Sequence, residues 1–261
     1  MAEGITSRDN ETVKYACKIG QSRTFRQSEG YFLAEGLRLC AELCKLHSPF
    51  KVFYTSLLQA AHPEVRAFGG MQYEIAPHIA EKMGETRSPQ GVFALFPLPQ
   101  TSLRDIRKNG RYVVLENVQD PANVGAVLRS AAAFGFDGAV LAGAAADPFG
   151  GKALRASMGA AGSIQIIMAQ DAAQAVQALR DQNILVYAAA LAGSCSLADV
   201  VPERDKGVAL LIGNEGSGLT NQALSLADGA VRIPMTDRVE SLNAAVAASV
   251  LLWHFRSGDA Q

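Results

Sequence analysis

The chain has 261 residues, of which 49% are apolar and 19% charged, and this composition predicts a folded protein and excludes an intrinsically disordered one. The length exceeds the roughly 100 to 200 residues of one typical domain, so we expect two domains. No apolar run reaches the roughly 18 residues of a membrane span, and the chain start lacks the apolar segment of a secretory signal. We therefore expect a cytoplasmic protein with no membrane contact.

The formal net charge of −1 hides a weak asymmetry along the chain. Residues 1–109 carry 14 Lys and Arg against 11 Asp and Glu, whereas residues 110–261 carry 10 against 14. A small positive excess is only a weak indication of a phosphate-rich partner, because ordinary solvated surfaces also reach it. Cys40, Cys44 and His47 follow helical spacing in an apolar stretch, which favours core packing over a metal site.

Residues 1–97 predict a small α/β domain. Residues 29–46 have helical periodicity, and β-branched and aromatic runs over residues 51–55, 72–75 and 92–96 predict strands. The opening segment alternates basic residues, Arg23 and Arg26 among them, with aromatic ones. That pattern suits either nucleic-acid binding through Tyr15, Phe25, Tyr31 and Phe32 or a solvated amphipathic helix, and the helix is favoured.

The polar segment PLPQTSLRDIRKNG predicts a linker over residues 98–110 and a second domain over residues 111–261. There, strand-like runs over residues 112–115, 138–141, 184–189 and 208–212 alternate with helical stretches such as 124–134 and 172–180, which predicts a parallel α/β sheet. The last stretch, LNAAVAASVLLWHF, predicts a helix that is covered on most sides, by core or by another subunit.

Three polar clusters carry the candidate chemistry. The glycine fingerprint G-x-G-x-x-G is absent after the first strand, which disfavours a dinucleotide-dependent dehydrogenase. The sequence there is QDPANVGAVLRSAAAFG, in which Asn123 can cap a helix and Asn123 and Arg129 can both donate to a phosphate or ribose. Taken alone, this cluster is explained better by a capped helix with a solvated arginine.

The second cluster, LLIGNEGSGLT, places an apolar strand before a glycine-rich loop, where Glu215 has little packing reason and could meet a cation or hydroxyl. In the third, RIPMTDRVESLNAAVAASV, Ser241 is a natural helix N-cap. The predicted helix that contains Asn243 carries no charged residue. The amide of Asn243 therefore needs a hydrogen-bond partner in the core, at a subunit contact or on a ligand.

In this order and spacing, the three clusters resemble the SpoU/TrmH family of the SPOUT superfamily, which comprises S-adenosylmethionine-dependent RNA ribose 2'-O-methyltransferases. The resemblance covers about residues 111–255. The segments SRDNETVK and FLAEG also resemble the N-terminal substrate-binding domain of many members, a small fold similar to ribosomal protein L30e.

The resemblance implies a parallel sheet with a C-terminal trefoil knot that binds S-adenosylmethionine, and a homodimer formed through the knotted domain. It implies a substrate RNA, with ribosomal RNA first, transfer RNA as the rival, and a non-catalytic RNA-binding protein as the alternative from another class. One departure is Asp237 and Arg238 where many members have a glycine, which we expect to alter the loop without abolishing binding. No metal is implied.

The residues that the resemblance assigns fall into three groups. The catalytic residues are Asn123, Arg129, Glu215, Ser241 and Asn243. The cofactor-binding residues are Ala189, Leu191, Gly213, Asn214, Gly218, Ile233, Met235 and Leu242. The RNA-binding residues are Arg23, Arg26, Arg129 and Arg155. We expect Arg129 to hold a phosphate and stabilise the developing alkoxide, since a guanidinium stays protonated, and Glu215 either to orient Arg129 or to take the proton.

Overall fold

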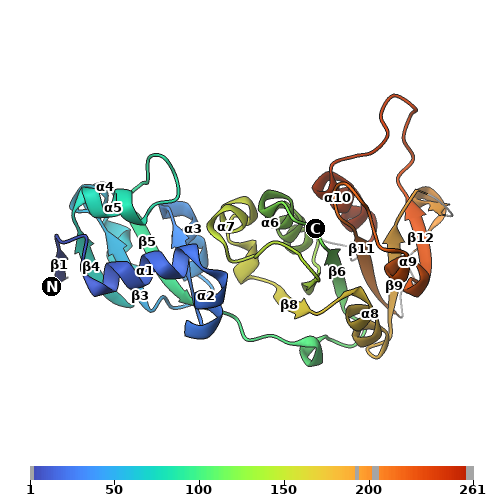
Figure 1. The fold of residues 1–261 in the computed structure, drawn as a ribbon, viewed down its shortest axis with the longest axis horizontal. Coiled ribbons are helices and arrows are strands. Elements are labelled where there is room, and N and C mark those ends of the chain that lie inside the picture. Colours follow the sequence, from blue (N-terminus) through green and yellow to red (C-terminus); the bar gives the residue numbers. More distant parts are fainter. Residues whose placement is uncertain (1–2, 192–193, 202–205, 257–261) are drawn as a thin grey trace. The chain divides into compact units, whose positions relative to one another are not determined.

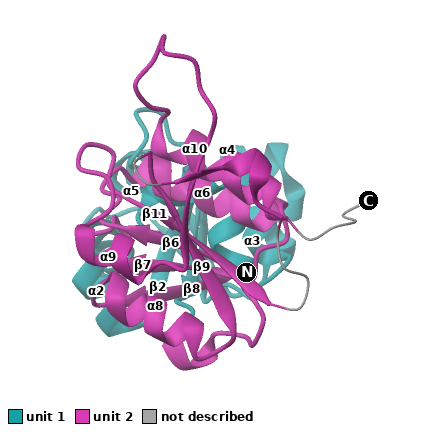
Figure 2. Cartoon of the chain, turned by 90° about the vertical axis from the view of Figure 1, so that its right-hand side faces the viewer, with its two compact units in different colours: residues 1–99, 149–163 teal, residues 100–148, 164–261 magenta. Residues whose placement is uncertain are grey.

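The fold is that of a computed structural model, which describes residues 3–191, 194–201 and 206–256. The chain forms two compact units, one of residues 1–99 with 149–163 and the other of residues 100–148 with 164–261 (Figure 2). Residues 149–163 join the first unit because Phe149 packs against Phe32 and Arg155 pairs with Glu85. The domain boundary over residues 98–110 stays a prediction.

The first unit is built on a mixed sheet in the order β1-β4-β3-β5-β2. Its strands are β1 (Glu3–Ile5), β2 (Tyr31–Glu35), β3 (Lys51–Tyr54), β4 (Met71–Ile75) and β5 (Val92–Pro97), and β5 is antiparallel to both of its neighbours. Its helices are α1 (Glu11–Gln21), α2 (Arg23–Glu29), α3 (Leu37–Cys44), α4 (Ser56–Ala61), α5 (Pro77–Met83) and α7 (Gly151–Ser157), with short 3-10 turns at Pro63–Phe68 and Ala160–Gly162. A core of Val13, Ile19, Phe53, Ile79 and Phe93 joins α1 and α5 to the sheet.

The predicted single helix over residues 29–46 is wrong. Helix α2 ends at Glu29, where Gly30 has a φ of 73°, and α3 begins only after Gly36, which has a φ of 99°. Both values lie in the left-handed region, which glycine adopts without strain. The segment between the two glycines is strand β2, whose Phe32, Leu33 and Ala34 are buried and pair with β5.

The second unit is built on a wholly parallel sheet in the order β10-β12-β9-β11-β6-β7-β8, which confirms the parallel α/β prediction. Its strands are β6 (Arg111–Glu116), β7 (Gly138–Ala142), β8 (Gln165–Ala169), β9 (Ile184–Ala189), β10 (Cys195–Ser196), β11 (Gly207–Ile212) and β12 (Gly229–Arg232). The four predicted strands appear as β6, β7, β9 and β11, whereas β8 was not predicted. Short 3-10 turns lie at Leu103–Asp105 and Leu197–Asp199.

Helices cover both faces of this sheet (Figure 1). On one side α6 (Pro121–Ala133) lies beside α10 (Ala244–His254), where the hydroxyl oxygens of Ser130 and Ser249 are 2.7 Å apart. On the other side α8 (Ala172–Arg180), next to α9 (Asn221–Leu226), packs Val176 and Leu179 onto the strands. In the described part of the chain, no helix is long and apolar enough to cross a membrane.

Both predicted helix caps were misplaced. Helix α6 is capped by Asp120, whose carboxylate accepts from the Ala122 N–H at 3.0 Å, so Asn123 lies inside the first turn. Helix α10 is capped by Asn243 and begins at Ala244, so Ser241 lies in the preceding loop. Asn123 therefore does not cap α6, and Ser241 does not cap α10. Both side chains are available for another role.

Candidate active site

The three polar clusters follow strands β6, β11 and β12, which end at the same edge of the parallel sheet. Strands β6 and β11 are direct neighbours, with Leu115 opposite Ile212, and β9 separates β11 from β12. Ligand sites of open parallel sheets lie at the carboxyl ends of the strands. The topology therefore brings the first cluster beside the second and third, which follow it in the sequence by about a hundred residues.

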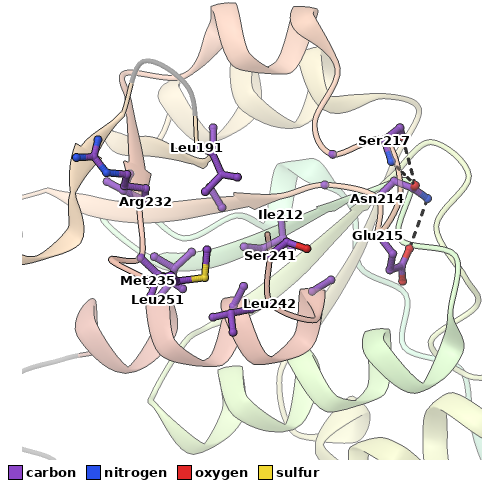
Figure 3. A pocket seen from close by; sticks show the side chains of 18 of the residues that line it. Leu191, Ile212, Asn214, Glu215, Ser217, Arg232, Met235, Ser241, Leu242 and Leu251 are labelled. Atoms are coloured by element: carbon purple, nitrogen blue, oxygen red, sulfur yellow. Dashed lines mark hydrogen bonds between the residues drawn. The ribbon is translucent and has the colours of Figure 1, made fainter. Parts of the chain in front are cut away.

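A cavity of about 420 Å³ lies at this edge, between the strand ends and α10 (Figure 3). Its volume falls in the range of small-molecule pockets, roughly 300 to 1,000 Å³. All eight residues predicted to bind cofactor line it: Ala189, Leu191, Gly213, Asn214, Gly218, Ile233, Met235 and Leu242. Of the predicted catalytic residues, Glu215 and Ser241 line it as well.

Sequence reasoning missed other residues of the same wall, among them Ile212, Val231, Arg232, Ala247 and Leu251. Most are small or apolar residues of strands and helix α10, whose pattern indicates core. Only their position at a strand end, or one or two helical turns after Asn243, could have marked them.

The loop after β11 is held in one compact conformation. A Cβ atom on Gly213 would lie 2.3 Å from the carbonyl carbon of Gly218, so the backbone approach requires glycine here. The Asn214 side chain donates to the Asn117 carbonyl at 2.9 Å and accepts from the N–H groups of Gly216 and Ser217 at 2.9 and 3.1 Å. These bonds fix the loop wall of the cavity, and Figure 3 shows those between Asn214 and Ser217.

Glu215 points from this loop to the start of α6. Its carboxylate accepts from the Asn123 amide at 2.8 Å and from the backbone N–H groups of Asp120 and Gln119 at 3.3 and 3.4 Å. Partial burial acts to raise the pKa of Glu215, but the hydrogen bonds from Asn123 and from backbone N–H groups outweigh it and lower the pKa below its ordinary value. Glu215 is therefore a carboxylate that orients Asn123.

Asn123 links Glu215 to the start of α10 through a second hydrogen bond. It is 8% exposed, and its Oδ1 accepts from the Nδ2 of Asn243 at 3.1 Å. The Oδ1 of Asn243 in turn accepts from the Ala245 and Val246 N–H groups at 2.9 and 3.3 Å. A relay of hydrogen bonds thus runs from Glu215 through Asn123 and Asn243 to the N-terminus of α10, with one member from each cluster.

Arg129 lies outside this relay, on the exposed face of α6. Among the residues that the structure describes, its guanidinium has no hydrogen-bond or ion-pair partner. An arginine held by no other side chain is available for a phosphate. The alternative that Glu215 orients Arg129 is not supported, since Glu215 bonds to Asn123 instead.

The other predicted RNA-binding arginines lie in the first unit and differ in their surroundings. Arg26 is 5% exposed, and its guanidinium donates to the carbonyl oxygens of Ile19 and Gly20 at the end of α1, a structural role in place of the predicted RNA contact. Arg155 pairs with Glu85 at 3.2 Å and Glu35 at 3.7 Å. Arg23 is half-buried in the first turn of α2.

The described residues contain no cluster of three or more His, Cys, Asp or Glu side chains arranged for a metal ion. Cys40 is buried in α3, where its thiol contacts the Ala34 carbonyl oxygen at 3.6 Å. Desolvation raises the pKa of this thiol, as expected for an inert core cysteine.

Comparison with known proteins agrees with this geometry. Residues 110–253 match the SpoU rRNA Methylase family, and residues 10–94 match the MRM3-like substrate binding domain. A Bacillus subtilis relative named 23S rRNA (guanosine(2553)-2'-O)-methyltransferase RlmP is 30% identical over 97% of this chain and 98% of its own length.

Solved structures of rRNA and SpoU methyltransferases are similar to this chain over nearly all of its length. The AdoMet-bound rRNA methyltransferase from Sinorhizobium meliloti has a TM-score of 0.87 at 31% identity, over 97% of both chains. The SpoU methyltransferase AviRb from Streptomyces viridochromogenes, in complex with AdoMet, has a TM-score of 0.85 at 27% identity, over 94% of this chain and 97% of that one. The chain belongs to the SpoU rRNA methylase family.

Proposed function

We propose that this protein transfers the methyl group of S-adenosylmethionine to a ribose 2'-hydroxyl of ribosomal RNA, with 23S rRNA as the substrate. The observation that carries the proposal is the relay from Glu215 to Asn243, which joins the three family clusters beside the cavity. The full-length similarity to a 23S rRNA 2'-O-methyltransferase supports the choice of substrate over transfer RNA.

The cavity suits S-adenosylmethionine in its size and in the character of its walls. Leu191, Ile233 and Leu242 offer apolar contacts to an adenine ring, and the glycines of the loop after β11 leave backbone groups within reach of a ligand. When bound, the cofactor supplies an electrophilic methyl group on a positively charged sulfur. The trefoil knot that the family implies stays a prediction for residues around β11 to α10.

The protein's own residues position the ribose and handle its charge. We assign Arg129 to an RNA phosphate and to the oxygen as it loses its proton, because its guanidinium carries a permanent charge that no described residue pairs. Ser241 lines the cavity and is not used as a helix cap, so its hydroxyl is available to the ribose. Holding the attacking oxygen in line with the methyl carbon supplies much of the rate in such a displacement.

The proton of the 2'-hydroxyl does not go to Glu215. Its lowered pKa makes Glu215 a weak base at neutral pH, and its oxygens already accept four hydrogen bonds. Glu215 and Asn243 are positioning residues, which fix Asn123 beside the reacting groups. The proton passes to an RNA phosphate oxygen or to water.

An apolar hollow on α10, with Ala126 of α6 at its edge, supports a homodimer. Val246 and Trp253 are 50% and 54% exposed, and they border a shallow apolar hollow with Ala126, Ala245 and Val250. Apolar faces of this kind mark subunit contacts. We propose that a second copy covers it, as the helix without charged residues also suggests. A ribosomal RNA substrate favours a cytoplasmic location.

The test is transfer of radiolabelled methyl from S-adenosylmethionine to 23S rRNA from a strain lacking its ribose methylations, both as naked RNA and in the large ribosomal subunit. Arg129→Ala should abolish transfer while calorimetric cofactor affinity is kept. Arg104→Ala removes another exposed arginine of the same unit and should leave transfer unchanged. Transfer to transfer RNA alone, or transfer by Arg129→Ala at the wild-type rate, would overturn the proposal.

A further inference from the structure

Three aromatic side chains of the first unit lie around one lysine. The ammonium of Lys51, the first residue of β3, lies 5.1 Å from the ring centre of Phe50, 5.6 Å from that of Tyr15 and 5.8 Å from that of Tyr73. These distances allow attraction between the charge and the ring faces. The three rings come from α1, β4 and the residue before β3, so the fold assembles the group.

Two more rings extend this group, which we call the aromatic cluster: Tyr15, Phe25, Tyr31, Phe50 and Tyr73. Tyr31 stacks on Phe50 with ring centres 4.7 Å apart, and Phe25 meets Tyr15 edge to face at 5.7 Å. A second ammonium, that of Lys18, lies 4.1 Å from the centre of Phe25. The cluster therefore carries two cations.

The aromatic cluster lies at the border of the core. Tyr15, Phe25, Tyr31 and Tyr73 pack against the core, and Tyr73 stacks on Phe53 with ring centres 5.3 Å apart. All five rings of the cluster are nevertheless only half-buried, whereas Phe53 and Phe93 inside the core are fully buried. Glu29 contacts the cluster, where it accepts from the Tyr15 hydroxyl at 3.1 Å.

Both lysines of the cluster lack a carboxylate partner among the described residues. Lys14 pairs with Glu11 at 3.2 Å and Lys45 with Glu42 at 2.8 Å, but no ion pair involves Lys51 or Lys18 there. The attraction between an ammonium and a ring face is roughly 0.5 to 1 kcal/mol at an accessible site. It offsets only part of the cost of removing the Lys51 ammonium from water. The site is suited to an anion that comes with a planar, stacking group.

We propose that the aromatic cluster and Lys51 bind an unpaired stretch of RNA, whose bases stack on the rings and whose phosphates contact Lys51 and Lys18. The inference rests on the proposed function, because it names the form in which this enzyme recognises its RNA substrate. Stacking needs bases that are free of a partner strand, since bases inside a duplex hide their faces from protein side chains. The first unit thus selects loops or single strands.

The test uses the full-length protein and two fluorescent probes, a mixed-sequence RNA decamer and the same decamer in a duplex, with affinity measured by anisotropy. The single strand should bind at least about tenfold more tightly than the duplex. Tyr15→Leu and Tyr73→Leu keep apolar contacts and should each weaken single-strand binding about tenfold, within the range for loss of one aromatic stack on a base.

Lys51→Met should weaken single-strand binding and reduce its salt dependence, with a slope smaller by about 0.7, the value for one phosphate contact on a single strand. Lys51→Arg should restore both. Lys45→Met, which removes a lysine outside the cluster, is the matched control and should bind like wild type. In methyl transfer, the cluster variants should raise KM for RNA and leave kcat unchanged.

Equal affinity for duplex and single strand, or wild-type binding by Lys51→Met and Tyr15→Leu, would overturn the inference. The same holds if Lys51→Arg binds as weakly as Lys51→Met. Failure of the proposed function has a different signature: no methyl transfer by wild type, with single-strand binding that still depends on Lys51.

Discussion

The hydrogen-bond relay has a fixed direction, which makes it open to a sharp test. The carboxylate of Glu215 can only accept, and the N-terminus of α10 can only donate. The amides of Asn123 and Asn243 between them must therefore point their nitrogen atoms toward Glu215 and their oxygen atoms toward α10. Asn243→Asp keeps an acceptor for the helix cap but removes the nitrogen that donates to Asn123.

The magnitudes follow from these contacts. Asn243→Ala loses the cap, worth about 1 kcal/mol, and the bond to Asn123, worth about 1 kcal/mol. Asn243→Asp should lose only the second, so its free energy of unfolding should fall by about 1 kcal/mol, half the loss of Asn243→Ala. The amides of Ala245 and Val246 should exchange hydrogen faster in Asn243→Ala than in Asn243→Asp, because aspartate still accepts from them.

The double variant Glu215→Gln/Asn243→Asp tests the direction itself. A glutamine can donate where the glutamate accepted, so Asn123 can turn its amide around and donate to Asp at position 243. The two substitutions should therefore cost less together than the sum of the single costs, by about 1 kcal/mol in urea unfolding. If the two costs add to within about 0.3 kcal/mol, as for independent sites, the relay does not couple the clusters and the reasoning is refuted.

Three further predictions concern the loop, the charge and the subunit contact. Gly213→Ala places a methyl group 2.3 Å from the Gly218 carbonyl carbon, so it should lower stability by more than about 2 kcal/mol and weaken cofactor binding, whereas Gly4→Ala, where a methyl group meets nothing, should be silent in calorimetry. Because the pKa of Glu215 is lowered in the folded state, its contribution is present above its ordinary pKa and is lost as the pH falls through the folded value. Urea unfolding between pH 7 and pH 3 should show this loss in wild type and not in Glu215→Gln. Trp253→Glu should convert the dimer to a monomer in sedimentation velocity, and a wild-type protein that sediments as a monomer would contradict the proposed interface.

Neighbouring parallel strands explain how much of the site could be predicted. Runs such as YVVL and VALLI are apolar and followed by polar residues, so β6 and β11 and the loops at their ends could be identified from the sequence. Parallel pairing then places those loops at one edge. Strand β8, with the sequence QIIMA, was not predicted; it begins with a polar residue, and Met168 within it is exposed.

The errors arose where distant residues decide the local structure. Ser241 and Asn243 are equally good helix caps by residue type, and the choice falls on Asn243, which also bonds to Asn123, 120 residues earlier in the sequence. Residues 31–35 fit a helix by periodicity, but pairing with β5 and the two flanking glycines make them a strand. Arg26 fits the alternation of basic and aromatic residues typical of nucleic-acid binding, but its guanidinium donates to a carbonyl oxygen at the end of α1.

The most direct test of the central claim is the chemical identity of the methylated nucleoside. Radiolabelled rRNA from the transfer reaction would be digested to nucleosides and separated by chromatography with mass spectrometry. A site that places a ribose hydroxyl beside Asn123 and Arg129 predicts label in a 2'-O-methylnucleoside, absent with Arg129→Ala. Label on a base would contradict the assignment of these residues to the ribose.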